Sequence, residues 1–228
     1  VIGLNVQLQA FMDKHIYPRE HDWHEWCLDQ DNLWVTPPWF DELRELAKAE
    51  GLWNLFLPRE YAPWSPGLSN VEIAPLFETM SKVLWAQPVF NCNAPDRGNM
   101  EVLAKYGTEA QQKEWLDPLV AGEIRSAYAM TEPQVASSDA TNMELEITRD
   151  GDEYVLNGRK WWTTGAINPR CKVMLVMGKS NPENPRHRQH STILVPRDTP
   201  GITLVRPLRV FDSLHSPGGE AELLFENV

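Results

Sequence analysis

The hydrophobic repeat of this chain changes near residue 123. Before that point, apolar residues recur every three or four positions, as they do along one face of a helix. Beyond it, Met143, Leu145 and Ile147 alternate with polar residues, which is the period of a strand with one face in water. The chain is therefore predicted to form an all-α helical domain over residues 1–122 and a β domain over residues 123–228.

Three helices are predicted in the first eighty residues. Leu8 and Phe11 recur at helical spacing in the opening stretch. Ser69 and Glu72 have the spacing of a capping box, so a third helix begins there. The second helix starts at a pair of prolines, ends at Gly51 and is expected to bury a stripe made of Phe40, Leu43, Leu46 and Ala47.

Two shorter helices are expected before the pattern changes. The first of them ends at Gly107. Thr108 and Gln111 then provide cap chemistry for the next, and Pro118 is expected to end it, because proline interrupts the hydrogen bonds of a helix.

Turn dipeptides divide the β half. Asp150-Gly151 and Asn157-Gly158 are typical hairpin turns, and both are expected to flank a strand over residues 154–156. Further short strands are predicted over residues 173–177, 192–195, 202–205 and 223–225. Their regular spacing predicts an antiparallel β-barrel or sandwich, and hence an α+β fold.

Composition excludes several classes of function. Lys and Arg total 21 against 32 Asp and Glu, a net charge of -11, so no general footprint for nucleic acid or anionic lipid is expected. Charged residues or prolines interrupt every apolar run before it is long enough to span a bilayer. Cys27, Cys92 and Cys171 are odd in number and widely spaced, which fits neither a disulfide framework nor a paired-cysteine metal site.

Two other groups of residues are weak candidates for sites. His15, His21 and His24 would converge on a metal with Cys27 only if one helix continued through Pro18, so no metal site is predicted.

The second group, formed by Asp212, Ser213 and His215, contains the residue types of a hydrolase triad. A triad is a spatial arrangement, however, and adjacency in a loop does not create one.

Two polar segments carry more information. One runs from Tyr128 through Thr131-Glu132-Pro133 to Asp139, and the other is Gly158-Arg159-Lys160-Trp161-Trp162-Thr163-Thr164-Gly165. They lie about one hairpin apart, so two strand ends can present hydroxyls and an indole to the same ligand. We call them the first and second motif segments.

Both segments resemble the flavin motifs of the acyl-CoA dehydrogenases. The first family motif is an aromatic residue followed by x-x-Thr-Glu-Pro and a loop ending in Ser-Asp, matched at residues 128–139. The second is Gly-x-Lys-x-Trp-x-Thr/Ser, matched at residues 158–164. Residues 90–95 and 188–191 further resemble the branch of family members ten and eleven and their bacterial relatives. The resemblance covers essentially the whole chain.

The resemblance implies an FAD cofactor bound by the β domain. Trp162 would cover one face of the flavin, and Thr164 would hydrogen-bond near its reactive nitrogen, where a donor stabilises arriving negative charge. Ser138 would also contact the acyl-CoA. The implied flavin contacts are Tyr128, Met130, Thr131, Ser137, Ser138, Trp162, Thr163 and Thr164.

The implied reaction is α,β-dehydrogenation of an acyl-CoA thioester in fatty acid β-oxidation, with electron-transfer flavoprotein as the electron acceptor. It requires a carboxylate base, which the family places in a C-terminal helical bundle expected to be absent from this sequence. Glu132 precedes Pro133 in a turn and is expected to be structural, so no catalytic residue is assigned. The resemblance also implies a homodimer or homotetramer, cytoplasmic in a bacterium and mitochondrial or peroxisomal in a eukaryote.

A basic stretch offers a site for the phosphates of coenzyme A. Two interpretations stay open, a solvated loop or a set of phosphate contacts. The residues concerned are Lys179, Arg186, His187, Arg188 and His190.

Two further functions compete with the dehydrogenase. Acyl-CoA oxidases and flavin monooxygenases of the same fold share these motifs but react with oxygen. The other alternative is a non-catalytic binding module, in which Thr131, Trp162 and Thr164 would be scattered in space instead of lining one groove.

Overall fold

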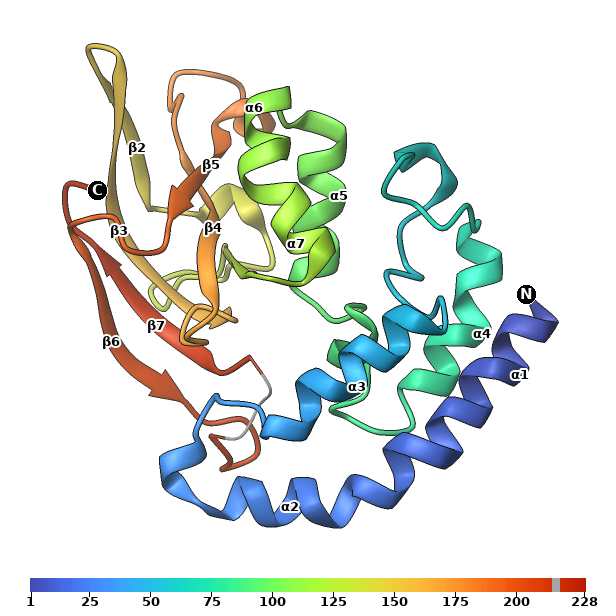
Figure 1. The fold of residues 1–228 in the computed structure, drawn as a ribbon. Coiled ribbons are helices and arrows are strands. Elements are labelled where there is room, and N and C mark those ends of the chain that lie inside the picture. The colour runs from blue at the N-terminus through green and yellow to red at the C-terminus, as the bar shows by residue number, and fades with distance from the viewer. Residues whose placement is uncertain (215–217) are drawn as a thin grey trace. The chain divides into compact units, whose positions relative to one another are not determined.

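The computed structural model describes residues 1–214 and 218–228, which form two compact units, Val1–Glu123 and Ile124–Val228. Figure 1 shows that the first unit is built from helices and the second from strands. The predicted fold class, a helical domain followed by a β domain, is confirmed. No helix in the described part of the chain is long and apolar enough to cross a membrane.

Seven α-helices make up the described helical unit. In it α1 and α4 lie side by side, and Thr79 donates a hydrogen bond of 2.9 Å to Asn5 between them. Short π-helical or 3-10 turns separate several of the helices. The helices are α1 (Ile2–Phe11), α2 (Glu20–Leu28), α3 (Pro38–Ala49), α4 (Asn70–Met80), α5 (Asp96–Tyr106), α6 (Glu109–Gln111) and α7 (Asp117–Ala121).

Side-chain caps set two helix starts where the sequence predicts them. The Ser69 and Glu72 side chains form a capping box at the start of α4, and Thr108 and Gln111 form another at α6. The prediction for Pro118 is wrong. This residue lies in the first turn of α7, where a backbone N–H has no intrahelical partner to lose, so the helix continues to Ala121.

The buried stripe of α3 also differs from the prediction. Leu46 is 41% exposed, whereas Arg44 is only 5% exposed. The Arg44 guanidinium donates to the carbonyl of Gly122 at 2.5 Å and packs over the Trp53 ring. The buried stripe of α3 thus includes Arg44, a buried arginine with a hydrogen-bond partner, and leaves out Leu46, which apolar periodicity places in it.

The β unit is a curled seven-stranded sheet in the order β1-β4-β2-β3-β7-β6, with β5 also paired to β4. Most neighbouring strands are antiparallel, but β1 runs parallel to β4, and β2 meets β4 in one parallel pair. The sheet is therefore mixed, not antiparallel throughout as the strand spacing predicts, although it curls as a barrel would. The strands are β1 (Arg125–Ala129), β2 (Glu146–Asp150), β3 (Glu153–Thr164), β4 (Cys171–Lys179), β5 (His190–Pro196), β6 (Ile202–Leu208) and β7 (Glu220–Phe225).

Only one of the two expected hairpin turns forms. Asp150 pairs with Glu153 across the turn that joins β2 and β3, as predicted. No turn forms at Asn157-Gly158, because β3 continues through both residues. A side chain at Gly158 would place its Cβ only 2.8 Å from the Cα of Leu145. This glycine permits close packing of two segments, which explains its place in a strand.

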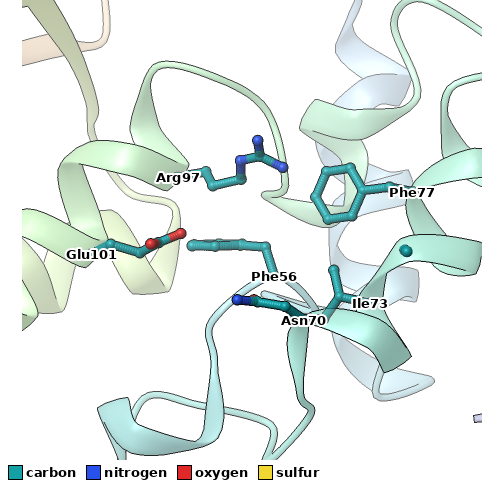
Figure 2. A pocket seen from close by; sticks show the side chains of 7 residues that line it. Phe56, Asn70, Ile73, Phe77, Arg97 and Glu101 are labelled. Atoms are coloured by element: carbon teal, nitrogen blue, oxygen red, sulfur yellow. The ribbon is translucent and has the colours of Figure 1, made fainter.

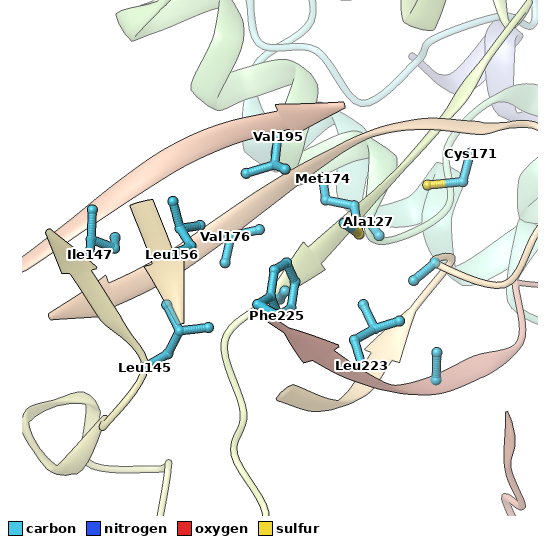
Figure 3. Close-up of a cluster of buried hydrophobic side chains, with 13 residues drawn as sticks. Ala127, Leu145, Ile147, Leu156, Cys171, Met174, Val176, Val195, Leu223 and Phe225 are labelled. Carbon is cyan, nitrogen blue, oxygen red and sulfur yellow. The ribbon is translucent and has the colours of Figure 1, made fainter. Parts of the chain in front are cut away.

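The core of the β unit gathers side chains from most of its strands. Met143, Leu145 and Ile147 are buried, as their alternation predicts, although β2 itself begins only at Glu146. Figure 3 shows Phe225 of β7 in the middle of this cluster. The strands that carry the motif segments are therefore supported by one continuous apolar core.

Phe225 provides a test of this core. Phe225→Ala is expected to lower the free energy of unfolding by about 3 to 5 kcal/mol, because the ring is 1% exposed and its loss leaves a cavity. Phe211→Ala is the matched control, since that ring is fully exposed and its removal should change stability by less than about 0.5 kcal/mol. Urea unfolding of both variants measures the difference, and equal effects would contradict the assignment.

Cys92 makes stability depend on pH. Burial raises the pKa of this thiol from 9.0 to about 12. As pH rises, the unfolded chain therefore loses the Cys92 thiol proton at a lower pH than the folded chain does. The contribution of this thiol to the free energy of unfolding is complete below pH 9 and is lost as pH rises through the folded pKa. Between pH 8 and pH 10 the free energy of unfolding should fall by about 1.4 kcal/mol more in the native sequence than in Cys92→Ala. Cys27→Ala, at a half-buried thiol, should keep most of the native slope.

Candidate functional site

The first motif segment leaves the sheet at the end of β1. Tyr128 lies in β1 beside Leu175 of β4, and its hydroxyl is 3.8 Å from the Met177 sulfur. Met130 and Thr131 follow directly and are half-buried. The three residues that the resemblance assigns to the flavin ring thus lie where a strand becomes a loop.

A backbone hydrogen bond joins the two motif segments. The Trp161 N–H in β3 donates to the carbonyl of Thr131 at 2.9 Å. The structure therefore brings the two segments together, as is expected of strand ends that lie about one hairpin apart. Trp161 was not among the predicted contacts, yet its indole Nε1 is shielded from solvent and has no hydrogen-bond partner among the described residues.

A buried ion pair reinforces this junction. Lys160 and Glu132 are 0% and 1% exposed, and the Lys160 Nζ lies 2.8 Å from the Glu132 Oε1. The same Nζ donates to the Met130 carbonyl at 2.8 Å. Burial lowers the pKa of Lys160, while the hydrogen bond and charge of Glu132 oppose that shift.

Both carboxylate oxygens of Glu132 are occupied. In addition to Lys160, the backbone N–H groups of Glu144 and Leu145 donate to them at 2.7 and 2.9 Å. These contacts agree with the expectation that Glu132 is structural, because a substrate proton would have to compete with the hydrogen bonds that its carboxylate already accepts. It ties the loop after β1 to the chain that enters β2.

The two serines of the first segment have different surroundings. Ser137 is buried, and its hydroxyl accepts the Glu132 N–H at 2.8 Å, which closes the loop upon itself. Ser138 is exposed. Of the two, Ser138 therefore presents its hydroxyl to solvent, and Ser137 stabilises the loop from within.

The second segment contains a β-bulge. The pairing of β3 with β7 shifts between Lys160 and Thr163, and Trp162 has a φ of 50°. A bulge redirects side chains, and here the Trp162 ring is 41% exposed and lies 6.0 Å from the Trp161 ring, centroid to centroid. The segment thus offers an aromatic surface to solvent from a defined backbone position.

The threonines that follow are less accessible. Thr163 is completely buried, and its Oγ1 has no hydrogen-bond partner among the described residues. The Thr164 hydroxyl donates to the Glu220 carboxylate on β7 at 2.7 Å. Both side chains therefore contribute to packing between β3 and β7 in this structure.

The basic stretch reaches the first motif segment through Arg186. Its guanidinium contacts the Asp139 carboxylate at 2.7 Å and also donates to the Thr141 hydroxyl. Hydrogen bonds from Thr141, followed by the charge of Arg186, hold the pKa of Asp139 below its usual range. The guanidinium of Arg186 is therefore already engaged. Arg188 lies in an exposed 3-10 turn, and its guanidinium is the more available of the two to a phosphate.

The weak candidates gain no support from the described residues. In residues 1–214 and 218–228, no three His, Cys, Asp or Glu side chains are placed to hold a metal. Asp212 and Ser213 lie in a tight turn, and His215, the third residue of the considered triad, is outside the described residues.

Comparison with known families covers both units. Profiles of the acyl-CoA dehydrogenase N-terminal domain and middle domain match residues 4–123 and 127–228. The chain belongs to the acyl-CoA dehydrogenase family. Mouse acyl-CoA dehydrogenase family member 10 is 52% identical over 97% of this chain, and human family member 11 is 50% identical over 98%. The chain spans only 21% and 29% of the length of these relatives.

Solved structures agree on the fold. A structure from Mycobacterium abscessus that is named for this family is 48% identical, with a TM-score of 0.94. The match covers 100% of this chain and 57% of that one. A glutaryl-CoA dehydrogenase from Mycobacterium smegmatis, solved in complex with FADH2, is 22% identical with a TM-score of 0.69 and supports the fold alone. This match covers 99% of the present chain and 52% of the glutaryl-CoA dehydrogenase chain.

Removing the buried lysine tests the junction. Lys160→Met is expected to lower the free energy of unfolding by about 3 to 5 kcal/mol, because it leaves the buried Glu132 carboxylate without its countercharge. Lys172→Met, at an exposed lysine in β4, should change stability by less than about 0.5 kcal/mol.

A double variant distinguishes the ion pair from simple packing. Glu132→Gln with Lys160→Met should cost less than the sum of the single substitutions, since no charge is then stranded. Additive losses measured by chemical unfolding would contradict a coupled pair.

Proposed function

We propose that this chain forms the flavin-binding part of an FAD-dependent acyl-CoA dehydrogenase that introduces an α,β double bond into an acyl-CoA thioester. The observation that carries the proposal is the junction of the two motif segments, formed by the buried pair of Glu132 with Lys160 and the bond from Trp161 to Thr131. It belongs to a chain of the acyl-CoA dehydrogenase family.

The residues present fit a flavin in part. The exposed Trp162 ring offers a flat apolar surface, and the Trp161 indole N–H is a shielded donor without a partner among the described residues. Flavin contacts would also come from Tyr128, Met130 and Thr131 at the end of β1. When bound, FAD would supply the acceptor for the hydride that leaves the substrate.

Two of the predicted contacts already have hydrogen-bond partners within the chain. The Thr164 hydroxyl donates to Glu220, so it can donate to a flavin only after releasing that carboxylate. Ser137 is engaged within its own loop, which makes it a positioning residue for the backbone that follows. Ser138 is exposed, and we assign it the contact to the acyl-CoA.

The substrate proton requires a base, and Glu132 does not provide one. Its two oxygens accept bonds from Lys160, Glu144 and Leu145. We therefore place the base outside this sequence, where the family resemblance puts it. Arg188 is the proposed contact to the phosphates of coenzyme A, and Arg186 would hold the loop beside it through Asp139.

The proposal extends to partners. Electron-transfer flavoprotein would receive the electrons, and the intact protein would form a homodimer or homotetramer. Its location would be cytoplasmic in a bacterium, or mitochondrial or peroxisomal in a eukaryote.

An absorbance spectrum of the intact gene product tests this function. We expect a yellow protein whose flavin band bleaches when acyl-CoAs of graded length are added without oxygen. Slow return of the band in air would favour a dehydrogenase over an oxidase. A protein that stays colourless after incubation with FAD would contradict the proposal.

Trp162 is the residue whose loss should affect the cofactor most directly. Trp162→Ala in the intact gene product is expected to weaken FAD binding about tenfold, because it removes an aromatic contact surface. Tyr154→Ala is the control, since Tyr154 is also exposed on β3 but lies outside the motif. Titration of apoprotein with FAD measures both, and unchanged affinity in Trp162→Ala would remove Trp162 from the site.

A further inference from the structure

The helical unit contains a pocket of about 360 Å³ that neither motif segment lines. It opens between α4 and α5, and Phe56 enters it from the chain between α3 and α4. Ile73 and Phe77 form the apolar wall on α4, and Arg97 and Glu101 come from α5. Its size is at the lower end of the range for small-molecule sites. All of its lining residues belong to the helical unit.

The charged side chains of this pocket are held apart. Figure 2 shows the Arg97 guanidinium extending toward Phe77, while the Glu101 carboxylate lies beside the Phe56 ring. The guanidinium carbon is 4.7 Å from the centroid of the Phe77 ring. Residues four apart on a helix commonly form ion pairs, yet in residues 1–214 and 218–228 no ion pair joins Arg97 to Glu101 or to another carboxylate.

Each charge stands to gain from a ligand of opposite sign. Arg97 occupies the first turn of α5, where the helix dipole disfavours a positive charge. Burial raises the pKa of the Glu101 carboxyl, and only part of that effect is offset by Arg97. A bound carboxylate would satisfy the guanidinium, and a bound ammonium would satisfy the carboxylate.

The balance of charge argues against a simple ion as ligand. An anion would meet Arg97 but be repelled by Glu101, and a cation would face the reverse arrangement. A molecule with both charges satisfies both side chains, and an apolar body would remain to pack on Phe56, Ile73 and Phe77.

We propose that this pocket binds a small zwitterion with an apolar body, such as an α-amino acid with an aromatic side chain. Its carboxylate contacts Arg97, its ammonium contacts Glu101, and its ring packs against the phenylalanines of the pocket. The site is built from the helical unit alone and includes no residue of either motif segment.

The test is a titration of the chain with L-phenylalanine, followed by the shifts of backbone amide signals in two-dimensional NMR. For a ligand of about a dozen non-hydrogen atoms we expect saturation with a Kd of about 1 mM. Two probes isolate the charges: 3-phenylpropionate lacks the ammonium, and phenethylamine lacks the carboxylate. Each should bind about tenfold more weakly than phenylalanine.

Variants assign the effect to the pocket. Arg97→Met and Glu101→Gln should each weaken phenylalanine binding about tenfold. Lys105→Met, on the same helix outside the pocket, should leave the Kd within about twofold. The same spectra report whether each variant is folded.

Three results would overturn the proposal. They are no saturable shift at about ten times the expected Kd, equal affinity of all variants, and equal binding of phenylalanine and 3-phenylpropionate. None of these outcomes bears on flavin binding, so this test and that of the proposed function fail separately.

Discussion

A single buried ion pair holds the candidate site together. A charged lysine and a charged glutamate are costly to remove from water, and they are tolerated only when each is paired and hydrogen-bonded. Lys160 and Glu132 meet this condition, because backbone groups of Met130, Glu144 and Leu145 complete their contacts. The pair therefore fixes three separate stretches of backbone relative to one another, namely the end of β1, the entry to β2 and the middle of β3.

The position of the exposed aromatic surface follows from this constraint. Trp162 is two residues beyond the buried Lys160, at a bulge that ends where Thr163 and Thr164 pair with β7 again. The bulge is thus anchored on one side by the ion pair and on the other by the backbone pairing of Thr163 and Thr164 with β7. A ring held at both flanks loses little further freedom when a flat ligand stacks on it, which favours binding.

Local signals explain how far the fold can be predicted from sequence. The capping boxes at Ser69 and Thr108 and the turn at Asp150-Gly151 act through near neighbours, and they form as predicted. Gly158 and Arg44 depend on partners far away in the sequence, Leu145 and Gly122. Their roles therefore cannot be inferred from the residues next to them. The same holds for Leu46, which periodicity places wrongly inside.

The candidate site, too, could be predicted only in part from the sequence. The residue types of the motif segments point to a flavin through family resemblance, and their joining is visible in the contact between Trp161 and Thr131. The partner of each hydroxyl could not be predicted. Ser137 is closed within its loop and Thr164 is bonded to Glu220, and both bonds depend on backbone geometry that only the folded sheet supplies. One signal was available, because the first motif segment carries only acidic charges, at Glu132 and Asp139, and the second only basic ones, at Arg159 and Lys160. Charges of opposite sign can neutralise each other when the two segments meet.

Amide hydrogen exchange tests the central claim most directly. If the buried pair ties the motif segments together, the amides of Trp161 and Leu145 should exchange as slowly as those in the core strand β4, and both should lose that protection in Lys160→Met while β4 keeps its own. Exchange of the Trp161 and Leu145 amides at the rate of exposed loops in the native protein would contradict the account.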